Sequence, residues 1–344
     1  MTFTHMTLSC LVASATIILG TPNSIAATRT APSTRSAGQT ELEMQVLLDR
    51  ANFSSGEIDG KGGKNSREAL AAFQTARGLA PGVRNRNALL KALGAGVVKP
   101  IVLYTITAED LAGPFVEKIP EDATEQSKLP GLYYTSLLEE LGEKFHSAPA
   151  LLQRLNPRAK FTSGEQIRVP NVLGAPLSVS DAARVEEADA KRTPASGQNG
   201  RTTPAQAEGV KVVVSKKASV LKVYSREGQI IFYAPVTSGS EHDPLPLGNW
   251  FVTSVVRNPT YNYNPDLFWD ADPANAKAKI AAGPNNPVGV VWIGLNHPHY
   301  GIHGTPEPGE IGHSESHGCV RMTNWDATRV ADLVKEGTPV VFEE

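Results

Sequence analysis

Residues 302–322 read IHGTPEPGEIGHSESHGCVRM, and this stretch decides how the rest of the sequence is interpreted. It holds Cys319 and His303, and five of the eight histidines of the chain lie between His297 and His317. A thiolate is the attacking form of cysteine, and an imidazole can take the thiol proton. The stretch therefore predicts nucleophilic catalysis, with Cys319 as the nucleophile and His303 as its base.

Length and composition set the outer bounds. The chain has 344 residues, more than one ordinary domain needs. Its formal net charge is -2, and this near-neutral balance does not indicate a nucleic-acid partner. Glycine and proline number 30 and 25, a level that indicates many turns and some linker.

An apolar run near the N-terminus, TLSCLVASATIILG at residues 7–20, has the length of a secretory h-region. Small residues follow at Ala26 and Ala27, so residues 1–27 are predicted to be a signal peptide cleaved there. A membrane anchor is the alternative, but the run is short for a span. The mature chain is expected to be exported, to the periplasm or cell wall, with no membrane span.

The two cysteines support this view of a reactive thiol. Cys10 lies in the apolar run and would leave with the signal peptide, so Cys319 has no partner for a disulfide. Exported cysteines usually pair. An unpaired one is either buried and inert or retained for its reactivity, and the surrounding histidines favour reactivity.

A helical pattern opens residues 40–95, where apolar side chains recur at i, i+3, i+4 and i+7 from Met44. Asn65 or Ser66 is placed to cap a second helix, and residues 85–93 predict a third. The sequence therefore predicts a small three-helix domain here.

The order QVLLDRANFSSGEIDGKGGKNSREALAAFQTARGL, residues 45–79, resembles the small peptidoglycan-binding domain in its Ile-Asp-Gly turn and its Ala-Leu and Phe-Gln pairs. The resemblance implies a module that holds the chain on the wall polymer. The alternative is any small helical bundle, because the match covers only about 50 residues.

The middle of the chain, residues 101–173, shows apolar helical stripes around Leu137 and Leu151 and a short strand at 166–170. The elements EELGEKF, LLQRLNP and GEQIRVP resemble a lysin-motif module, which implies recognition of amino-sugar chains. The opening strand and turn of that module are not found in the sequence, so a purely structural role is equally open. Residues 175–209 are rich in small and polar residues and predict a flexible linker.

Strand patterns dominate residues 210–344. Short alternating runs separated by Gly and Pro turns predict a β-sandwich or barrel, including a hairpin at 220–236. One helix is expected near the end, capped by Thr323 and Asp326 and ended by Gly337. The fold class predicted for the whole chain is multi-domain α+β, with helical modules before a mainly-β domain.

The stretch at 302–322 also resembles the signature of the L,D-transpeptidases of bacterial cell walls: a histidine, a spacer, then Ser/Thr-His-Gly-Cys. The upstream segments PLPLGNWFVTSVVRNPTY, at 244–261, and GPNNPVGVVWIGL, at 283–295, also match that family. Several pieces in one order are a specific signal. The resemblance covers residues 210–344, and Arg321-Met322 stand where some members have Asn.

The resemblance implies roles for further residues. His317 and Gly318 would supply backbone N–H groups to an oxyanion hole, although the spacing also leaves His317 as a candidate base. Ser316 could orient the loop, and Gly304 and Thr305 could orient His303. All three are also candidate substrate-binding residues.

The substrate side of the site rests on fewer residues. Arg321 can grip a carboxylate bidentately, with an ion pair to Asp326 as the equally weighted alternative. Tyr300 is a candidate substrate contact, but it and Trp292 lie at apolar strand ends and are better explained by packing.

A zinc site built from His297, His299, His313, His317 and Cys319 is conceivable, but the spacings match no common structural zinc pattern. No metal and no cofactor are therefore predicted.

By implication of the family, the donor is a peptidoglycan stem tetrapeptide. Cys319 would attack the carbonyl of its third residue, release D-alanine and form a thioester, which an amine of a neighbouring stem resolves into a 3-3 cross-link. Water in place of the amine would make an L,D-carboxypeptidase, and another amine could attach a protein to the wall. A non-catalytic peptidoglycan-binding protein is the alternative from another class, and carbapenem labelling of Cys319 would distinguish it.

Overall fold

A computed structural model describes residues 1–2, 37–79, 89–90, 92–94, 98–174, 209–269, 271 and 276–344. Residues Ser36–Glu344 form one compact unit, and Met1–Arg35 form another. Almost all of the predicted signal peptide and of the predicted linker lies outside the described residues. Among the described residues, no helix has the length and apolarity that a membrane crossing requires.

The helical domain, described at residues 37–79, 89–90 and 92–94, contains α1 (Ala37–Arg50) and α2 (Lys64–Ala76). Leu89 and Leu90 are helical and buried where a third helix was predicted. The rings of Phe53 and Phe73 pack edge to face in the core of this domain, with their centroids 5.4 Å apart. The cap predicted for α2 is wrong: Gly63 is the N-cap, and Asn65 donates instead to the Ile311 carbonyl at 3.1 Å.

The middle region, residues 98–174, begins and ends with a strand. Its helices and strands, in chain order, are β1 (Ile101–Thr105), α4 (Ala108–Ala112), α5 (Ala123–Gln126), α6 (Leu137–Lys144), α7 (Pro149–Leu155) and β2 (Gln166–Pro170). The prediction that an opening strand is missing is wrong, because β1 pairs antiparallel with β2 along its whole length. β1 was not apparent from the sequence because its apolar run has no alternating period and because its partner strand lies far away in the sequence.

The C-terminal domain, residues 209–344, is built on a nine-stranded sheet of order β5-β4-β3-β13-β7-β10-β11-β12-β6. The strands of the sheet are β3 (Lys211–Ser215), β4 (Val220–Tyr224), β5 (Ile230–Pro235), β6 (Thr237–Ser238), β7 (Gly248–Arg257), β10 (Val291–Leu295), β11 (Gly301–His303), β12 (Val320–Arg321) and β13 (Pro339–Glu343). A separate pair, β8 (Tyr261–Tyr263) and β9 (Ala278–Ile280), flanks the short helix η1 (Pro265–Leu267), and η2 (Pro308–Glu310) follows β11.

The two ends of this sheet are consecutive in the chain. β5 and β6 stand at opposite ends of the strand order, yet only Val236 separates them. One residue cannot cross an open nine-stranded sheet, whose strands lie about 4.8 Å apart, so the sheet must curl until its ends nearly meet. The mainly-β, barrel-like domain predicted from the sequence is therefore observed.

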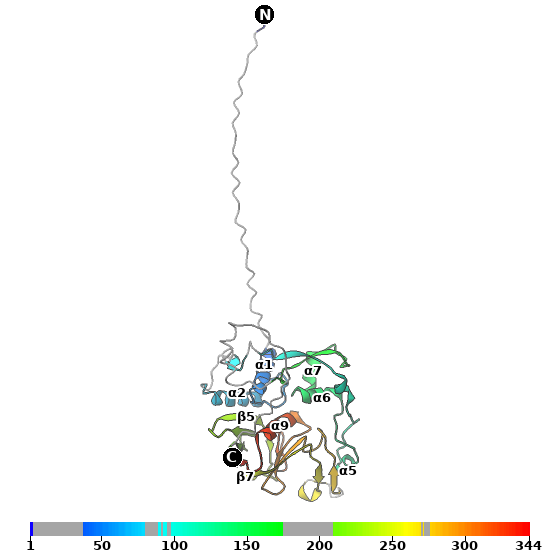
Figure 1. Cartoon of the computed structure of the whole chain (residues 1–344), viewed down its shortest axis with the longest axis vertical. Coiled ribbons are helices and arrows are strands. Elements are labelled where there is room, and N and C mark those ends of the chain that lie inside the picture. The colour runs from blue at the N-terminus through cyan, green and yellow to red at the C-terminus, as the bar shows by residue number, and fades with distance from the viewer. Residues whose placement is uncertain are drawn as a thin grey trace. The chain divides into compact units, whose positions relative to one another are not determined.

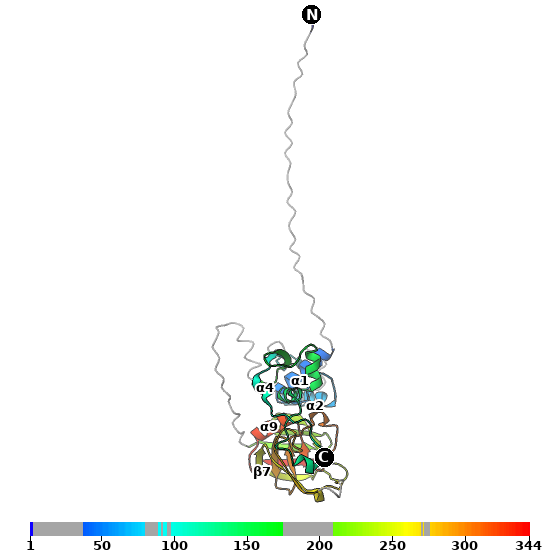
Figure 2. The same cartoon turned by 90° about the vertical axis from the view of Figure 1, so that its right-hand side faces the viewer.

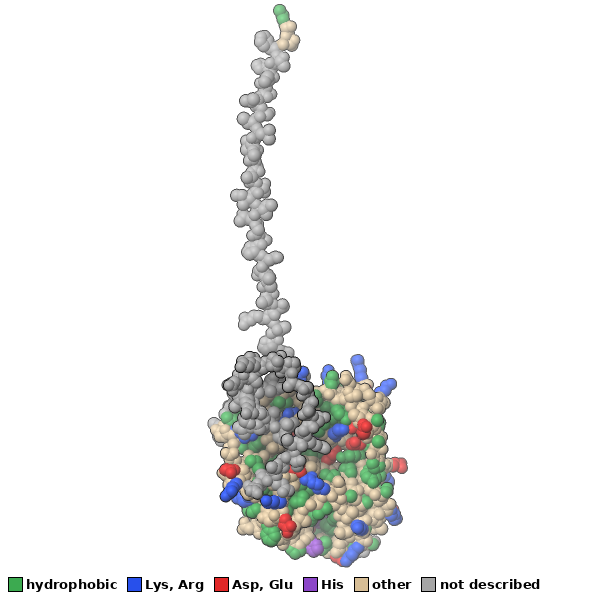
Figure 3. Space-filling model, in the orientation of Figure 1, with side chains coloured by type: hydrophobic (Ala, Val, Ile, Leu, Met, Phe, Trp, Pro, Cys, Tyr) green, Lys and Arg blue, Asp and Glu red, His purple; other side chains and the backbone are tan. Residues whose placement is uncertain are grey.

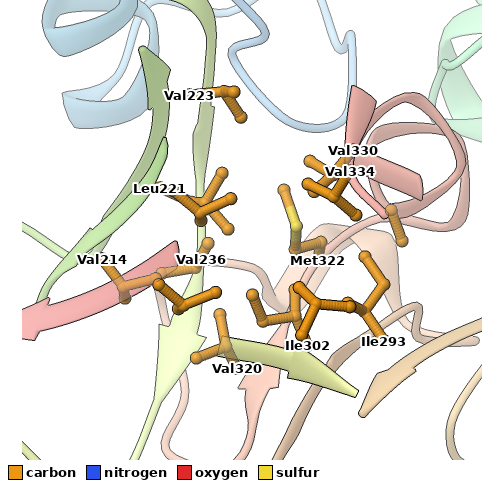
Figure 4. Packing of buried hydrophobic residues seen from close by; sticks show 14 of the residues in the cluster. Val214, Leu221, Val223, Val236, Ile293, Ile302, Val320, Met322, Val330 and Val334 are labelled. Carbon is orange, nitrogen blue, oxygen red and sulfur yellow. The ribbon is translucent and has the colours of Figure 1, made fainter. Parts of the chain in front are cut away.

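The interior of the curled sheet is apolar. Leu221, Ile302, Met322 and Val330 are fully buried and point toward one another (Figure 4). Val330 comes from α9 (Asn324–Leu333), the predicted C-terminal helix, and Thr323 caps it by accepting from the Asp326 N–H at 3.2 Å. The helix ends at Leu333, before the predicted Gly337, because Val334 is already extended.

Figures 1 and 2 show α1 and α2 on one side of the C-terminal domain, with α9 at the boundary. Direct contacts join the three regions of this compact unit. Ser54 of the helical domain hydrogen-bonds to Asp326 at 2.7 Å, and the backbone of Leu132 in the middle region bonds to Ala282 at 3.0 Å. On the face drawn in Figure 3, acidic and basic side chains are interspersed, as the near-neutral net charge predicts.

Candidate active site

A cavity of about 570 Å³ opens in the C-terminal domain, and both His303 and Cys319 line it. Its volume lies in the range of ligand pockets, about 300–1,000 Å³. His303 comes from β11, and Cys319 immediately precedes β12. These strands are parallel neighbours, with Ile302 opposite Val320, so sheet pairing brings together two residues that a long loop separates.

The ring of His303 is held on two sides. Its Nδ1 lies 2.7 Å from the Gly304 carbonyl, and the ring stacks on Trp292 with centroids 5.5 Å apart. A carbonyl can only accept, so Nδ1 carries the hydrogen and Nε2 keeps its lone pair. The neutral ring is thus in the tautomer that can take a proton at Nε2.

The surroundings of His303 and Cys319 favour the neutral form of each side chain. Burial lowers the pKa of His303 to about 4; the bond to Gly304 opposes this shift and the charge of Arg321 adds to it. Burial raises the pKa of the Cys319 thiol, although the Gly301 amide and Arg321 oppose the rise. The arrangement favours a thiol with a neutral imidazole over a preformed ion pair.

The turn before Cys319 is fixed by a serine hydroxyl. Ser316 Oγ accepts from the Gly239 N–H at 2.7 Å and donates to the Cys319 carbonyl at 2.6 Å. Ser316 is 3% exposed and is not among the residues that line the cavity. This geometry favours a role of Ser316 in orienting the turn over a direct substrate contact.

Gly318 has a backbone conformation that favours glycine. Its φ is +94°, and a Cβ there would lie 2.5 Å from the Tyr300 ring. Tyr300 therefore covers the backbone next to Cys319 and also lines the cavity. His317 lines the cavity with its ring edge-on to Phe268, at 4.9 Å.

Gly304 and Thr305, the other predicted site residues, do not line the cavity. Gly304 supplies the carbonyl that orients His303, and Thr305 is 5% exposed with its hydroxyl accepting from the Glu307 N–H at 3.2 Å. Their absence from the lining favours a supporting role for both positions over a direct substrate contact.

Arg321 lines the cavity, and its backbone pairs with that of His303 across the β11–β12 ladder. The alternative ion pair with Asp326 is absent, because the Asp326 carboxylate accepts from Ser54 and Thr323. Among the residues that the structure describes, no carboxylate pairs with Arg321.

Sequence reasoning missed part of the cavity wall. Tyr261 and Phe268, around η1, line it together with Asp243 from the segment before β7. Trp292, explained from the sequence by packing alone, both lines the cavity and supports His303. Tyr261 and Phe268 lie in the segment that the pairing of β8 with β9 closes into a loop, and this loop forms one wall of the cavity that Cys319 lines. A pairing of distant strands leaves no local pattern in the sequence.

The remaining histidines do not gather around a metal position. His297 packs edge-on to Trp250 and Tyr300. His299 lines the cavity, and its carbonyl accepts from the Cys319 thiol at 3.5 Å. Within the described ranges, no group of three His, Cys, Asp or Glu side chains is placed to hold a metal ion.

Comparison with known proteins gives two matches to family models. The model of the L,D-transpeptidase catalytic domain matches residues 209–342, and that of a putative peptidoglycan binding domain matches residues 39–87. The cavity described above lies within the first match, and α1 and α2 lie within or across the second.

Curated relatives match the same C-terminal part. The putative L,D-transpeptidase YkuD of Bacillus subtilis is 47% identical over 131 residues, which are 38% of this chain and 64% of that protein. The putative L,D-transpeptidase YqjB of the same organism is 30% identical over 139 residues, 39% of this chain and 70% of that protein. The chain thus spans just under two thirds of the YkuD protein.

Among solved structures, L,D-transpeptidase LdtMt1 in complex with imipenem is 18% identical, with a TM-score of 0.33 over 39% of this chain and 58% of that one. An L,D-transpeptidase from Mycobacterium smegmatis is 19% identical, with a TM-score of 0.33 over 40% and 59%.

Proposed function

The chain belongs to the L,D-transpeptidase family, and we propose that it transfers peptidoglycan stem peptides through a thioester on Cys319. The observation that carries this proposal is that His303 and Cys319 line the same cavity. The imidazole favours its neutral form, and the bond to the Gly304 carbonyl uses Nδ1, which leaves Nε2 to accept a proton. A thiol and a base with no other partner at Nε2 are the equipment for acyl transfer.

In the proposed first step, the sulfur of Cys319 attacks an amide carbonyl of the donor while Nε2 of His303 takes the thiol proton. The carbon–nitrogen bond of the tetrahedral intermediate then breaks. The departing amine, D-alanine, receives the proton from Nε2, and the acyl group remains on sulfur as a thioester. Backbone N–H groups of the turn at His317–Cys319 are proposed to stabilise the oxyanion.

In the second step, an acceptor amine attacks the thioester carbonyl and loses its proton to His303. The carbon–sulfur bond breaks, and the proton passes from Nε2 to the sulfur, which restores the resting thiol. With the amine of a neighbouring stem as acceptor, the product is a 3-3 cross-link.

Two charged side chains in the cavity suit such a donor. Arg321 offers a guanidinium for a carboxylate, and Asp243 offers a carboxylate for an ammonium group. A stem peptide with a free C-terminal carboxylate and a diamino acid carries both partners.

The helical domain is proposed to hold the chain on its polymer, since its sequence matches a peptidoglycan-binding model. Tethering raises the effective concentration of stem peptides near the cavity without changing the chemistry. The substrate places the working protein outside the cytoplasm, in the periplasm or cell wall. Glycan binding by the middle region stays a prediction.

The test is to incubate the purified protein with tetrapeptide muropeptides and to identify the products by mass spectrometry. We expect tripeptide-linked dimers with the native chain and none with Cys319→Ala. Asp332→Asn, on the exposed side of α9, is the matched control and is expected to retain activity. Tripeptide monomers without dimers would favour the L,D-carboxypeptidase alternative.

A second measurement separates an enzyme from a non-catalytic wall-binding protein. A carbapenem carries a strained amide that a reactive thiol opens, so the native chain should gain the mass of one inhibitor and Cys319→Ala should gain none. Folded native protein that acquires neither adduct nor product would overturn the catalytic proposal.

A further inference from the structure

Asn324, the first residue of α9, packs against Gly304, the residue after His303, and does not line the cavity. Its side chain is 2% exposed. Oδ1 accepts from the Val290 N–H at 3.0 Å, and Nδ2 donates to the Pro284 carbonyl at 3.2 Å. One buried carboxamide therefore ties α9 to the segment that leads into β10.

The same carboxamide packs against the backbone that orients His303. A Cβ on Gly304 would lie 2.1 Å from Asn324 Oδ1, and a Cβ on Gly289 would lie 2.0 Å from it. Such distances leave room for glycine alone, so the carboxamide fills the space that both glycines leave open. The Gly304 carbonyl accepts from His303, so the ring's place depends on where α9 puts Asn324.

Helix α9 is in turn anchored by the helical domain. Arg329 donates to both carboxylate oxygens of Asp49, at 2.9 and 3.1 Å, and Ser54 donates to Asp326 at 2.7 Å. Asp49 is 1% exposed. A buried bidentate pair of this kind fixes both distance and direction, since the planar guanidinium admits one orientation.

The middle region adds a third contact to this junction. His146 Nδ1 lies 3.0 Å from Asp49, and its ring stacks on Trp325 of α9 with centroids 5.0 Å apart and planes 9° apart. Burial alone would raise the pKa of Asp49, but Arg329 and His146 hold it well below its usual range. The carboxylate stays charged and keeps all its partners.

From these contacts we propose that Asn324 is a positioning residue for His303, and that Asp49 and Ser54 of the helical domain set the position of Asn324 through α9. The helical domain would then support the chemistry directly as well as hold the polymer. The inference rests on the base role proposed for His303, and its test includes a readout that does not depend on that role.

The expected signature follows from burial of the imidazole. Loss of the carboxamide would leave a space beside the Gly304 backbone, which would let that backbone shift and would admit water near the ring of His303. The pKa of His303 would then rise from about 4 toward its ordinary value, because burial is the main cause of the low pKa. The neutral ring is the active form, so the acid limb of the rate profile would move to higher pH.

The experiment uses the full chain and three variants: Asn324→Ala, Asp49→Asn and, as a matched control, Asp332→Asn. Asp332 also pairs with an arginine, Arg257 at 2.5 Å, but on the exposed side of the same helix. The first readout is the rate of carbapenem acylation of Cys319 against pH. The second is the pKa of His303 from NMR titration of ¹⁵N-histidine-labelled protein, assigned with His303→Ala.

We expect Asn324→Ala to slow acylation by about tenfold to a hundredfold, a cost typical of a misplaced catalytic group. The acid limb of its pH–rate profile should move to higher pH, and the pKa of His303 measured by NMR should rise. Asp49→Asn should shift the pH–rate profile and the pKa of His303 in the same direction by a smaller amount. Asp332→Asn should leave the profile and the pKa unchanged.

A folded Asn324→Ala that keeps the native His303 pKa and the native acid limb would overturn the proposal. If Asn324→Ala does not fold, Asp49→Asn and Ser54→Ala decide: unchanged profiles in both would also overturn it. If the native chain is not acylated at all, the proposed function fails, while the NMR pKa still decides whether Asn324 positions His303.

Discussion

Two histidines of this molecule have closely similar surroundings. His303 stacks on Trp292 with centroids 5.5 Å apart, and His146 stacks on Trp325 at 5.0 Å. Each is fixed through Nδ1, and burial lowers the pKa of both. The difference lies on the other side of each ring.

His303 borders a cavity that also holds a thiol, whereas His146 is enclosed by a charged pair, Asp49 and Arg329. A buried, oriented imidazole is therefore not enough to make a base. Space for a substrate and a nucleophile in the same cavity distinguish the catalytic candidate from the structural one.

The largest effect should come from removing each ring in turn. We expect His303→Ala to slow carbapenem acylation by about 100-fold to 10,000-fold, the usual contribution of a general base. His146→Ala should slow it less than about tenfold and should instead lower stability by about 1–3 kcal/mol, since Asp49 loses a buried partner. Adduct mass against time and thermal melts measure the two effects; equal losses of acylation would erase the distinction.

A pair of glycines sharpens the comparison within the cavity. Gly318 and Gly228 both have positive φ, +94° and +80°, but only Gly318 is covered, by Tyr300. Gly318→Ala should slow acylation by about tenfold or more, because the new Cβ must displace that ring. Gly228→Ala bears only the backbone strain of about 1 kcal/mol and should acylate normally. Similar rates for the two variants would contradict a positioning role for the turn before Cys319.

The pH dependence of acylation should follow His303. The neutral imidazole is the reactive form, so the rate is fully present above its pKa and is lost as pH falls through about 4. Rates measured from pH 3.5 to 8, on protein shown to be folded at each pH, give the midpoint. A midpoint near 6.5 would mean that the ring is solvated in the working enzyme.

The stability of the junction around His146 should depend on pH through the carboxyl group of Asp326. Burial raises the pKa of Asp326 to about 7, so the folded chain keeps a proton that the unfolded chain has lost between about pH 4 and pH 7. Its contribution to stability therefore falls as pH rises through that window. Asp326→Asn should flatten the curve, with a difference in melting temperature of about a few degrees. Parallel curves for the two proteins would place the titration elsewhere.

The sequence singled out Cys319 and His303, which line one cavity, because their signal is local and rare. Cys319 is the one cysteine outside the N-terminal apolar run, and His303 ends an apolar strand. Alternation of apolar side chains likewise located most strands of the C-terminal domain, since one face of each strand is buried. These features need no knowledge of distant partners.

What the sequence could not supply depends on pairing over long distances. β1 was missed because its partner β2 begins only at Gln166, and the wall around Phe268 because β8 and β9 pair across an intervening helix. Asn65 has the chemistry of a helix cap, yet its amide bonds to a carbonyl in the C-terminal domain. A local rule fails wherever a tertiary partner offers the better hydrogen bond.

The single residue between β5 and β6 has a consequence for engineering. β6 pairs with β12, and the register Val320 opposite Ser238 is inherited from that short connection. An inserted residue at Val236 would shift β6 by one strand step, about 3.3 Å, and reverse which of its side chains face inward. Loop grafting at this corner would therefore disturb the thiol, whereas the hairpin tip at Gly228, with open space around it, is the place for a tag or a fused reporter.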